Sequence, residues 1–440
     1  MSLRARRRSD IEASRFTGRV RRTGGLLRTV GNAALRCCSP RVGRQCPDCP
    51  DLEVRVPIVF VHGVANRDDD WAYQSDRFAR DALFQRYVHP AAGISTKASV
   101  LSPYWGGRAA TFRYDHVSLP DQATLVEDFG GEDADELALA AHLVEPVADP
   151  SRLVVEVARR STADAADLLL TFTGLGVARD ERSAQAFAEL AFRVTELVPV
   201  LDASGELRTA KDDDEALGLL IRRLEVSAAP AAGSDESFGG ADWYTDLGEG
   251  LMRLRNVAGR LTGRAVMELT RASMHKKVAL FLGDVLTYVN KRGTADDPGP
   301  IPRIVGDEIS AARRDGEPLI VVAHSMGGNI VYDVLSYFRP DLQVDVLVTV
   351  GSQVGLFAEL GLLRVQEDQS APAGRLRLPG RTVRWLNVLD LNDALAFATD
   401  QIFDGAKDTP YSTGRGLLAA HAAYFRTASF YQLVARYLER

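Results

Sequence analysis

A serine, a histidine and the aspartates between them lie in the last third of the chain, and these residue types together can perform nucleophilic catalysis. Ser325 stands in the segment Ala-His-Ser-Met-Gly, and His421 is the only histidine that follows it. Asp390 and Asp393 lie between the two. A serine hydroxyl attacks an acyl carbon efficiently only when a base takes its proton and an acid holds that base in the right tautomer. These residues therefore predict acyl transfer through a serine nucleophile.

The residues around the serine predict a sharp turn from a strand into a helix. Residues 319–322 form a short apolar run rich in β-branched side chains, which is typical of a buried parallel strand. Apolar side chains recur at helical spacing over residues 329–338. Ala323 and Gly327 are small where such a strand and helix nearly touch. The N–H of Met326 would begin the helix and point toward the place where an oxyanion forms.

This segment resembles the nucleophile elbow of the α/β-hydrolase superfamily, as found in bacterial lipases and esterases. It departs from the family pattern Gly-x-Ser-x-Gly only at the first position, where Ala323 stands. The resemblance covers residues 56–105 and 265–440. It implies an α/β-hydrolase fold with a reduced, mostly parallel sheet of about six strands, because two strands of the family have no room before residue 56.

The resemblance also implies which residues form the catalytic triad. Ser325 is the expected nucleophile, and His421, in a loop before a terminal helix, is the expected base. Asp393 lies one loop beyond a predicted strand, where the family places its acid, and is therefore the expected third member. Asp390, at the end of that strand, is expected to brace the loop and is the first alternative for the acid. Asp404 is a further alternative for the acid.

A second donor for the oxyanion is expected in the loop after an earlier strand. The apolar run 56–61 leads directly into His62-Gly63-Val64, and a His-Gly pair at this place marks the oxyanion loop of the family. Gly63 would let the backbone turn, so that the N–H of Val64 faces the site. His62 is expected to support this loop structurally. His324 precedes the nucleophile and is expected to point away from the base.

The composition is that of a soluble globular protein. The chain has 440 residues, of which 46% are hydrophobic and 25% charged. No apolar run has membrane-spanning length, and no early apolar segment resembles a signal peptide, so a cytoplasmic location is expected. Residues 1–50 contain 12 arginines and three acidic residues, a net charge of +9, which leaves −15 for the remainder. The acidic remainder argues against nucleic-acid binding by the main domain.

Residues 1–55 are predicted to form a basic, cysteine-containing tail without stable structure. The tail is expected either to be solvated or to make peripheral contact with an anionic membrane surface. All four cysteines lie here, at Cys37, Cys38, Cys46 and Cys49. The last two have the spacing of a zinc knuckle, but the adjacent first two form a poor second half. Reduced thiols are therefore predicted, and no metal site.

The remaining chain divides into a core, expected at 56–110 and 264–440, and an insertion at 111–263. The insertion is too long for one crossover between neighbouring strands. We expect a helical lid or cap over the site, with a helical module docked elsewhere as the alternative. A low-complexity linker is predicted at 228–240. Helical spacing of apolar residues is found at 137–145, 153–170, 184–197 and 215–224.

The predicted function is hydrolysis of a carboxylic ester, either a small molecule or a lipid. The long insertion favours a bulky or lipid-like acyl group, and no cofactor is expected. Two alternatives remain open at this point. One is a non-catalytic hydrolase-like scaffold that binds a protein or membrane partner, and the other is an acyltransferase that uses the same triad.

Overall fold

The computed structural model describes residues 58–67, 71–114, 149–178, 180–228, 243–260, 264–314, 317–366, 374–415 and 419–439. All of them belong to one compact unit, Glu53–Arg440. The predictions for the basic tail, its four cysteines and the helix at 137–145 lie outside the described residues. So does most of the predicted linker at 228–240.

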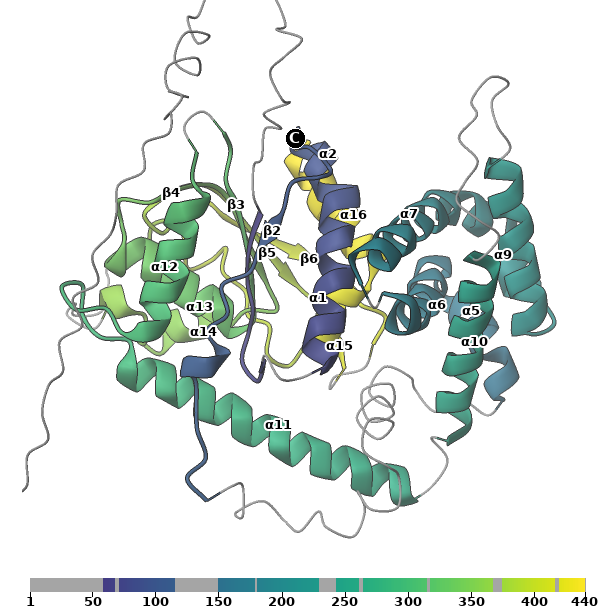
Figure 1. The fold of residues 1–440 in the computed structure, drawn as a ribbon, viewed down its shortest axis with the longest axis horizontal. Helices are drawn as coiled ribbons and strands as arrows, with labels where there is room; N and C mark the ends of the chain where they lie inside the picture. The colour runs from purple at the N-terminus through teal and green to yellow at the C-terminus, as the bar shows by residue number, and fades with distance from the viewer. Residues whose placement is uncertain are drawn as a thin grey trace, which may run out of the picture. The chain divides into compact units, whose positions relative to one another are not determined.

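The centre of this unit is a six-stranded sheet with the strand order β2-β1-β3-β4-β5-β6 (Figure 1). Every pairing between these described strands is parallel, which confirms the predicted parallel sheet. Strand β2 has two residues. The strands are β1 (Ile58–Val61), β2 (Val100–Leu101), β3 (Ile320–His324), β4 (Gln343–Val350), β5 (Arg381–Leu389) and β6 (Ala406–Pro410).

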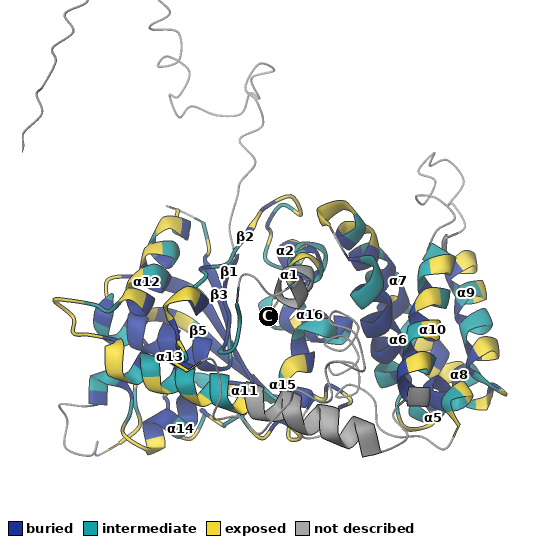
Figure 2. Cartoon of the chain, turned by 60° about the horizontal axis from the view of Figure 1, so that its bottom comes forward, coloured by how far each residue is buried: buried dark blue, intermediate teal, exposed yellow. Residues whose placement is uncertain are grey.

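Strand β1 and the first four residues of β3 are apolar throughout, because helices cover both faces of the sheet. Alternate residues of β1 and β3 belong to different hydrophobic clusters: Val59 and Val321 face one cluster, and Phe60 and Val322 face the other. Figure 2 shows the strands as buried between two layers of helices. Buried strands of this kind carry no polar alternation, so they can be recognised from the sequence as continuous apolar runs.

One face of the sheet is covered by α12 (Pro300–Ala312), α13 (Met326–Asp333), α14 (Val354–Glu359) and the C-terminal part of α11 (Arg264–Lys291). The other face is covered by α1 (Trp71–Leu83), its π-helical continuation η1 (Phe84–Val88), α2 (His89–Ala91) and α16 (Ala428–Leu438). A second π-helical turn, η4 (Val334–Phe338), extends α13. Shorter segments are α15 (Ala420–Ala423) and the 3-10 turns η2 (Gly106–Arg108), η3 (Pro150–Arg152), η5 (Arg364–Gln366) and η6 (Tyr424–Arg426).

Helix α11 is tied to α13 by a buried acid. The hydroxyl of Tyr288 donates to Asp333 at 2.9 Å, and Arg292, directly after α11, donates to the same carboxylate at 2.9 Å. All three side chains are buried. None of the described helices, the 28-residue α11 included, combines the length and apolar character that crossing a membrane requires.

The described part of the insertion is a group of helices packed against α1 and α16 (Figure 1). Their apolar side chains join those of α1 and α16 in one continuous hydrophobic cluster. The hydroxyl groups of Tyr87 and Thr195 also meet there, 2.9 Å apart. The helices are α5 (Leu153–Arg160), α6 (Thr162–Val177), α7 (Glu181–Ser204), α8 (Glu206–Thr209), α9 (Asp213–Ala228) and α10 (Trp243–Arg260).

Candidate active site

Ser325 occupies a strained turn between β3 and α13, at the carboxyl end of the sheet. Its φ of 54° and ψ of −129° are unusual for a residue with a side chain, and such a conformation costs on the order of 1–3 kcal/mol. The neighbouring strand compensates through two hydrogen bonds. The N–H of Ser325 donates to the carbonyl of Val350 at 2.9 Å, and the hydroxyl of Ser352 donates to the carbonyl of Ser325 at 3.0 Å. The nucleophile candidate is therefore held rigidly.

Two glycines allow the elbow and the loop after β1 to touch. A Cβ on Gly327 would lie 2.5 Å from the carbonyl oxygen of Val61 and 2.8 Å from that of His62. A Cβ on Gly63 would lie 2.7 Å from the Cβ of Ser325. Close approach explains both glycines. The prediction that Gly63 is needed for a backbone turn is wrong. Among the described non-glycine residues of this loop, the positive φ is that of Ala65, at 61°.

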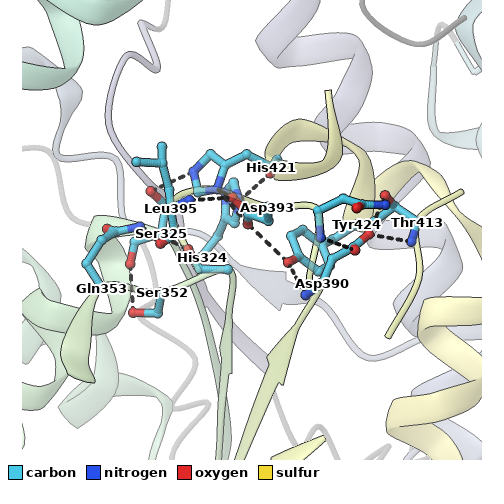
Figure 3. A network of polar contacts seen from close by, with 12 residues as sticks. His324, Ser325, Ser352, Gln353, Asp390, Asp393, Leu395, Thr413, His421 and Tyr424 are labelled. Carbon is cyan, nitrogen blue, oxygen red and sulfur yellow. Dashed lines mark hydrogen bonds and ion pairs between the residues drawn. The ribbon is translucent and has the colours of Figure 1, made fainter. Parts of the chain in front are cut away.

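The structure brings together the serine, histidine and aspartate that the sequence analysis proposed (Figure 3). His421, on α15, places Nε2 2.9 Å from the hydroxyl oxygen of Ser325. Its Nδ1 lies 2.9 and 3.0 Å from the two carboxylate oxygens of Asp393. A neutral imidazole in this position donates from Nδ1 to the carboxylate and accepts the serine proton at Nε2. The geometry suits removal of the serine proton by His421.

Asp393 is buried but remains the better acid candidate. The N–H of Leu395 donates to it at 2.9 Å, and the hydroxyl of Tyr424 donates to it at 3.0 Å. Burial acts to raise the pKa of Asp393, but the hydrogen bonds and the neighbouring His421 outweigh it and hold this pKa below its ordinary value. The carboxylate therefore stays ionised beside the imidazole.

The other two aspartates lie away from the histidine. Asp390 accepts hydrogen bonds from the N–H and the hydroxyl of Thr413, both at 2.7 Å, and from the N–H of Asn392 at 2.9 Å. It braces the loop after β5. Asp404 forms an exposed ion pair with Arg375 instead.

Tyr424 is a functional candidate that was not identified from the sequence. Its hydroxyl accepts a hydrogen bond from the N–H of Asp390 at 2.8 Å and donates to Asp393. The tyrosine thus links the brace of the loop to the acid (Figure 3). The available signal was its position three residues after His421, which places both side chains on one side of a helical turn.

Residues that follow β4 contact the candidate acid and base and the loop that carries the acid. Gly351 has a φ of 54°, and a Cβ there would lie 2.7 Å from a carboxylate oxygen of Asp393 and 3.3 Å from Nδ1 of His421. The side-chain amide of Gln353 donates to the carbonyls of Gly351 at 3.0 Å and of Leu395 at 2.7 Å. This amide fastens the acid-bearing loop to β4.

His324 lies beside the base and not away from it, which corrects the prediction. The rings of His324 and His421 are 4.9 Å apart, and Nε2 of His324 donates to the carbonyl of His421 at 2.9 Å. Strand alternation places His324 on the same face as Val322, and the C-terminal segment covers that face. Burial, followed by the neighbouring His421, lowers the pKa of His324 to about 3, so it remains neutral.

His62 supports the loop after β1, as the sequence suggested. Its Nδ1 donates to the carbonyl of Gly63 at 2.7 Å, and its Nε2 accepts the N–H of Trp105 at 3.2 Å. The two rings stack with centroids 4.8 Å apart. Burial lowers the pKa of His62 to about 4, which keeps the imidazole neutral and structural.

The same loop contains a candidate main-chain donor for an oxyanion. The side-chain amide of Asn66 donates to the carbonyls of Gly63 at 3.0 Å and of Val64 at 3.1 Å. Since the N–H of Val64 lies opposite the Gly63 carbonyl in one planar peptide, it points the other way. Within the described chain, the N–H groups of Val64 and Met326 donate to no protein acceptor. They are the two candidates for binding an oxyanion.

Comparisons with known proteins add no assignment to this geometry. No family model matches the chain, and neither a curated protein nor a solved structure matches it. Among the described residues, no three or more His, Cys, Asp or Glu side chains converge as metal ligands would. The functional argument therefore rests on the residues and distances given above.

Proposed function

We propose that this protein is a serine hydrolase of the α/β-hydrolase fold that cleaves a carboxylic ester. The observation that supports this most strongly is the unbroken chain of hydrogen bonds from Ser325 through His421 to Asp393, at 2.9 Å for each link. A strained elbow at the carboxyl end of a parallel sheet carries the serine. Nucleophile, base and acid are thus arranged as acyl transfer requires.

In the proposed reaction, Nε2 of His421 takes the hydroxyl proton of Ser325 as the oxygen attacks the ester carbonyl. The negative charge that develops on the carbonyl oxygen is stabilised by the N–H groups of Val64 and Met326. His421 then gives the proton to the departing alcohol, which leaves an acyl-serine. Water attacks this acyl group with His421 again as base, and His421 then returns the proton to the Ser325 oxygen as the acid product leaves. Asp393 holds the imidazole in the required tautomer throughout.

The predicted substrate is a carboxylic ester, either a small molecule or a lipid. Acyl transfer to an alcohol other than water would use the same groups, so the two outcomes differ only in the second acceptor. Product analysis in the presence of a competing alcohol separates them. A dominant transfer product would replace hydrolysis as the function and leave the triad assignment intact.

The direct test is labelling of the purified protein by a fluorophosphonate, together with hydrolysis of p-nitrophenyl butyrate. Ser325→Ala is expected to lose labelling and to lower kcat by at least about 10³-fold. Ser336→Ala is the matched control, because its hydroxyl only bonds the carbonyl of Tyr332 within the helix, and it should label like the wild type. A folded wild type that neither labels nor hydrolyses esters would count against the proposal.

A further inference from the structure

Asp284, in the middle of α11, is a fully buried carboxylate with an unusual set of partners. One oxygen accepts the N–H of Ala65 at 2.8 Å and a guanidinium nitrogen of Arg67 at 3.1 Å. The other accepts the second guanidinium nitrogen at 2.8 Å and the N–H of Ala110 at 2.9 Å. Its side chain has 0% exposure. A buried charge is tolerated only with such complete pairing.

These bonds reach the loop that carries Val64 from a point 219 residues further along the chain. Ala65 has a φ of 61°, a conformation that costs an ordinary L-residue on the order of 1–2 kcal/mol. The bond from its N–H to Asp284 secures that turn. The side-chain amide of Asn66 donates hydrogen bonds to the carbonyls of Gly63 and Val64. The peptide groups on both sides of Val64 are thereby oriented.

The close approach of α11 depends on the residue before the aspartate. A Cβ on Gly283 would lie 2.8 Å from the Cβ of Ala110. A larger residue there would push α11 away from the segment after β2, and Asp284 with it. Gly283 and Asp284 together therefore serve one contact between α11 and the two loops at the edge of the sheet.

We infer that Asp284 is a positioning residue for the proposed ester hydrolysis: it fixes the loop at Ala65 and Arg67 so that the N–H of Val64 faces the oxyanion. This inference rests on the proposed function. It assigns to α11 a role in stabilising the transition state, although Asp284 itself contacts neither the serine nor the histidine. A donor displaced by a few tenths of an ångström weakens transition-state binding and leaves ground-state binding nearly unchanged.

Asp284→Asn replaces one acceptor oxygen by an NH₂ group, which cannot accept from Arg67 and the main chain. With p-nitrophenyl butyrate, kcat is expected to fall about 30- to 100-fold while KM changes less than about threefold. The inhibition constant of a trifluoromethyl ketone, which forms a tetrahedral adduct with the serine, should rise by the same factor as kcat/KM falls. A purely structural role would not produce this division between kcat and KM.

Tyr288→Phe is the matched control, since Tyr288 lies one turn further along α11, is equally buried and bonds a different acid, Asp333. It should cost a few degrees in Tm, about 2–4 °C, with kcat within threefold of wild type. If Asp284→Asn does not fold, the Arg67→Lys variant tests the inference instead. Lysine supplies one donor nitrogen in place of two, so it cannot match the bidentate contact, and kcat should fall about 3- to 10-fold at constant KM.

Three results would overturn the inference. The first is a folded Asp284→Asn variant whose kcat matches that of Tyr288→Phe, and the second is an Arg67→Lys variant with unchanged kcat. The third is a loss that appears only in KM. These outcomes, seen with an active wild type, remove only the role of Asp284. A wild type without esterase activity removes the proposed function as well.

Discussion

At the scale of single residues, two neighbouring carboxylates of the candidate site have different hydrogen-bond partners. Asp393 faces His421, whereas Asp390 faces the N–H and hydroxyl of Thr413. Tyr424 lies between them and bonds both segments. Two acids only three residues apart thus have different tasks, because each one's task is set by the donors that reach it.

This difference predicts unequal effects of two identical substitutions. Asp393→Asn is expected to lower kcat by about 10³- to 10⁴-fold, because an amide no longer holds His421 in the tautomer that accepts the serine proton. Asp390→Asn removes acceptors from Thr413 and should mainly lower Tm, with less than about tenfold loss in kcat. Steady-state kinetics and thermal melting of both variants measure this. Equal losses in kcat for the two variants would contradict the assignment of Asp393 as the single triad acid.

At the scale of elements, the site depends on how closely α13 approaches β1. The elbow turns within one residue, so the first turn of α13 lies directly against the end of β1. Main-chain oxygens of Val61 and His62 fill the space beside Gly327. Backbone atoms cannot rotate away as a side chain can, so this contact leaves no room for a Cβ at position 327.

Gly327→Ala is therefore expected to destabilise the fold by about 1–3 kcal/mol through overpacking. The added Cβ would lie 2.5 Å from a carbonyl oxygen, so α13 has to move, and Ser325 with it. Urea unfolding measures the stability loss, and fluorophosphonate labelling should slow in parallel. Gly361→Ala is a useful comparison, because nothing lies within 4 Å of a Cβ there, although its positive φ adds strain. A Gly327 variant with unchanged stability and labelling would contradict the contact.

At the scale of the whole molecule, the insertion is joined to the segment that follows His421. The hydroxyl of Thr171, on α6, donates to the carbonyl of Arg426 at 3.1 Å. Asp167, one turn earlier, accepts the N–H and the hydroxyl of Ser429 at the start of α16. The described insertion helices therefore support the C-terminal segment that carries His421. The expectation that the insertion also caps the site stays a prediction.

Asp167 gives this contact a pH dependence. Burial raises its pKa from 3.8 to about 6. The folded protein therefore binds more protons than the unfolded chain between about pH 4 and pH 6, and stability falls as the pH rises through that window. Asp167→Asn removes this loss, so its stability relative to wild type should improve by about 2–3 kcal/mol between pH 4 and pH 7.

Urea unfolding of both proteins at several pH values between 4 and 7 measures this difference. Asp202→Asn is the control in the same insertion, because that side chain is 59% exposed. Solvent screens an exposed carboxylate, so its variant should change far less with pH. A difference that is constant with pH for Asp167→Asn would contradict the effect.

Local patterns in the sequence were sufficient to predict the buried parallel strands and the elbow. These features depend on neighbours a few residues apart: apolar runs, helical spacing, and small residues at Ala323 and Gly327. The order of serine, acid and histidine, and the choice of Asp393, were implied by the resemblance to the α/β-hydrolase superfamily. For the described residues, this covers the sheet and the three side chains that meet at its edge.

The tertiary structure alone decided which distant residues hold that edge in place. No pattern in the sequence pairs Asp284 with Ala65, since the two lie 219 residues apart and neither alters the periodicity of its own segment. The same holds for His324 against His421, and for Asp167 against Ser429. Such pairs form only when whole elements pack, because packing brings a buried charge or ring to the one place where its partner lies.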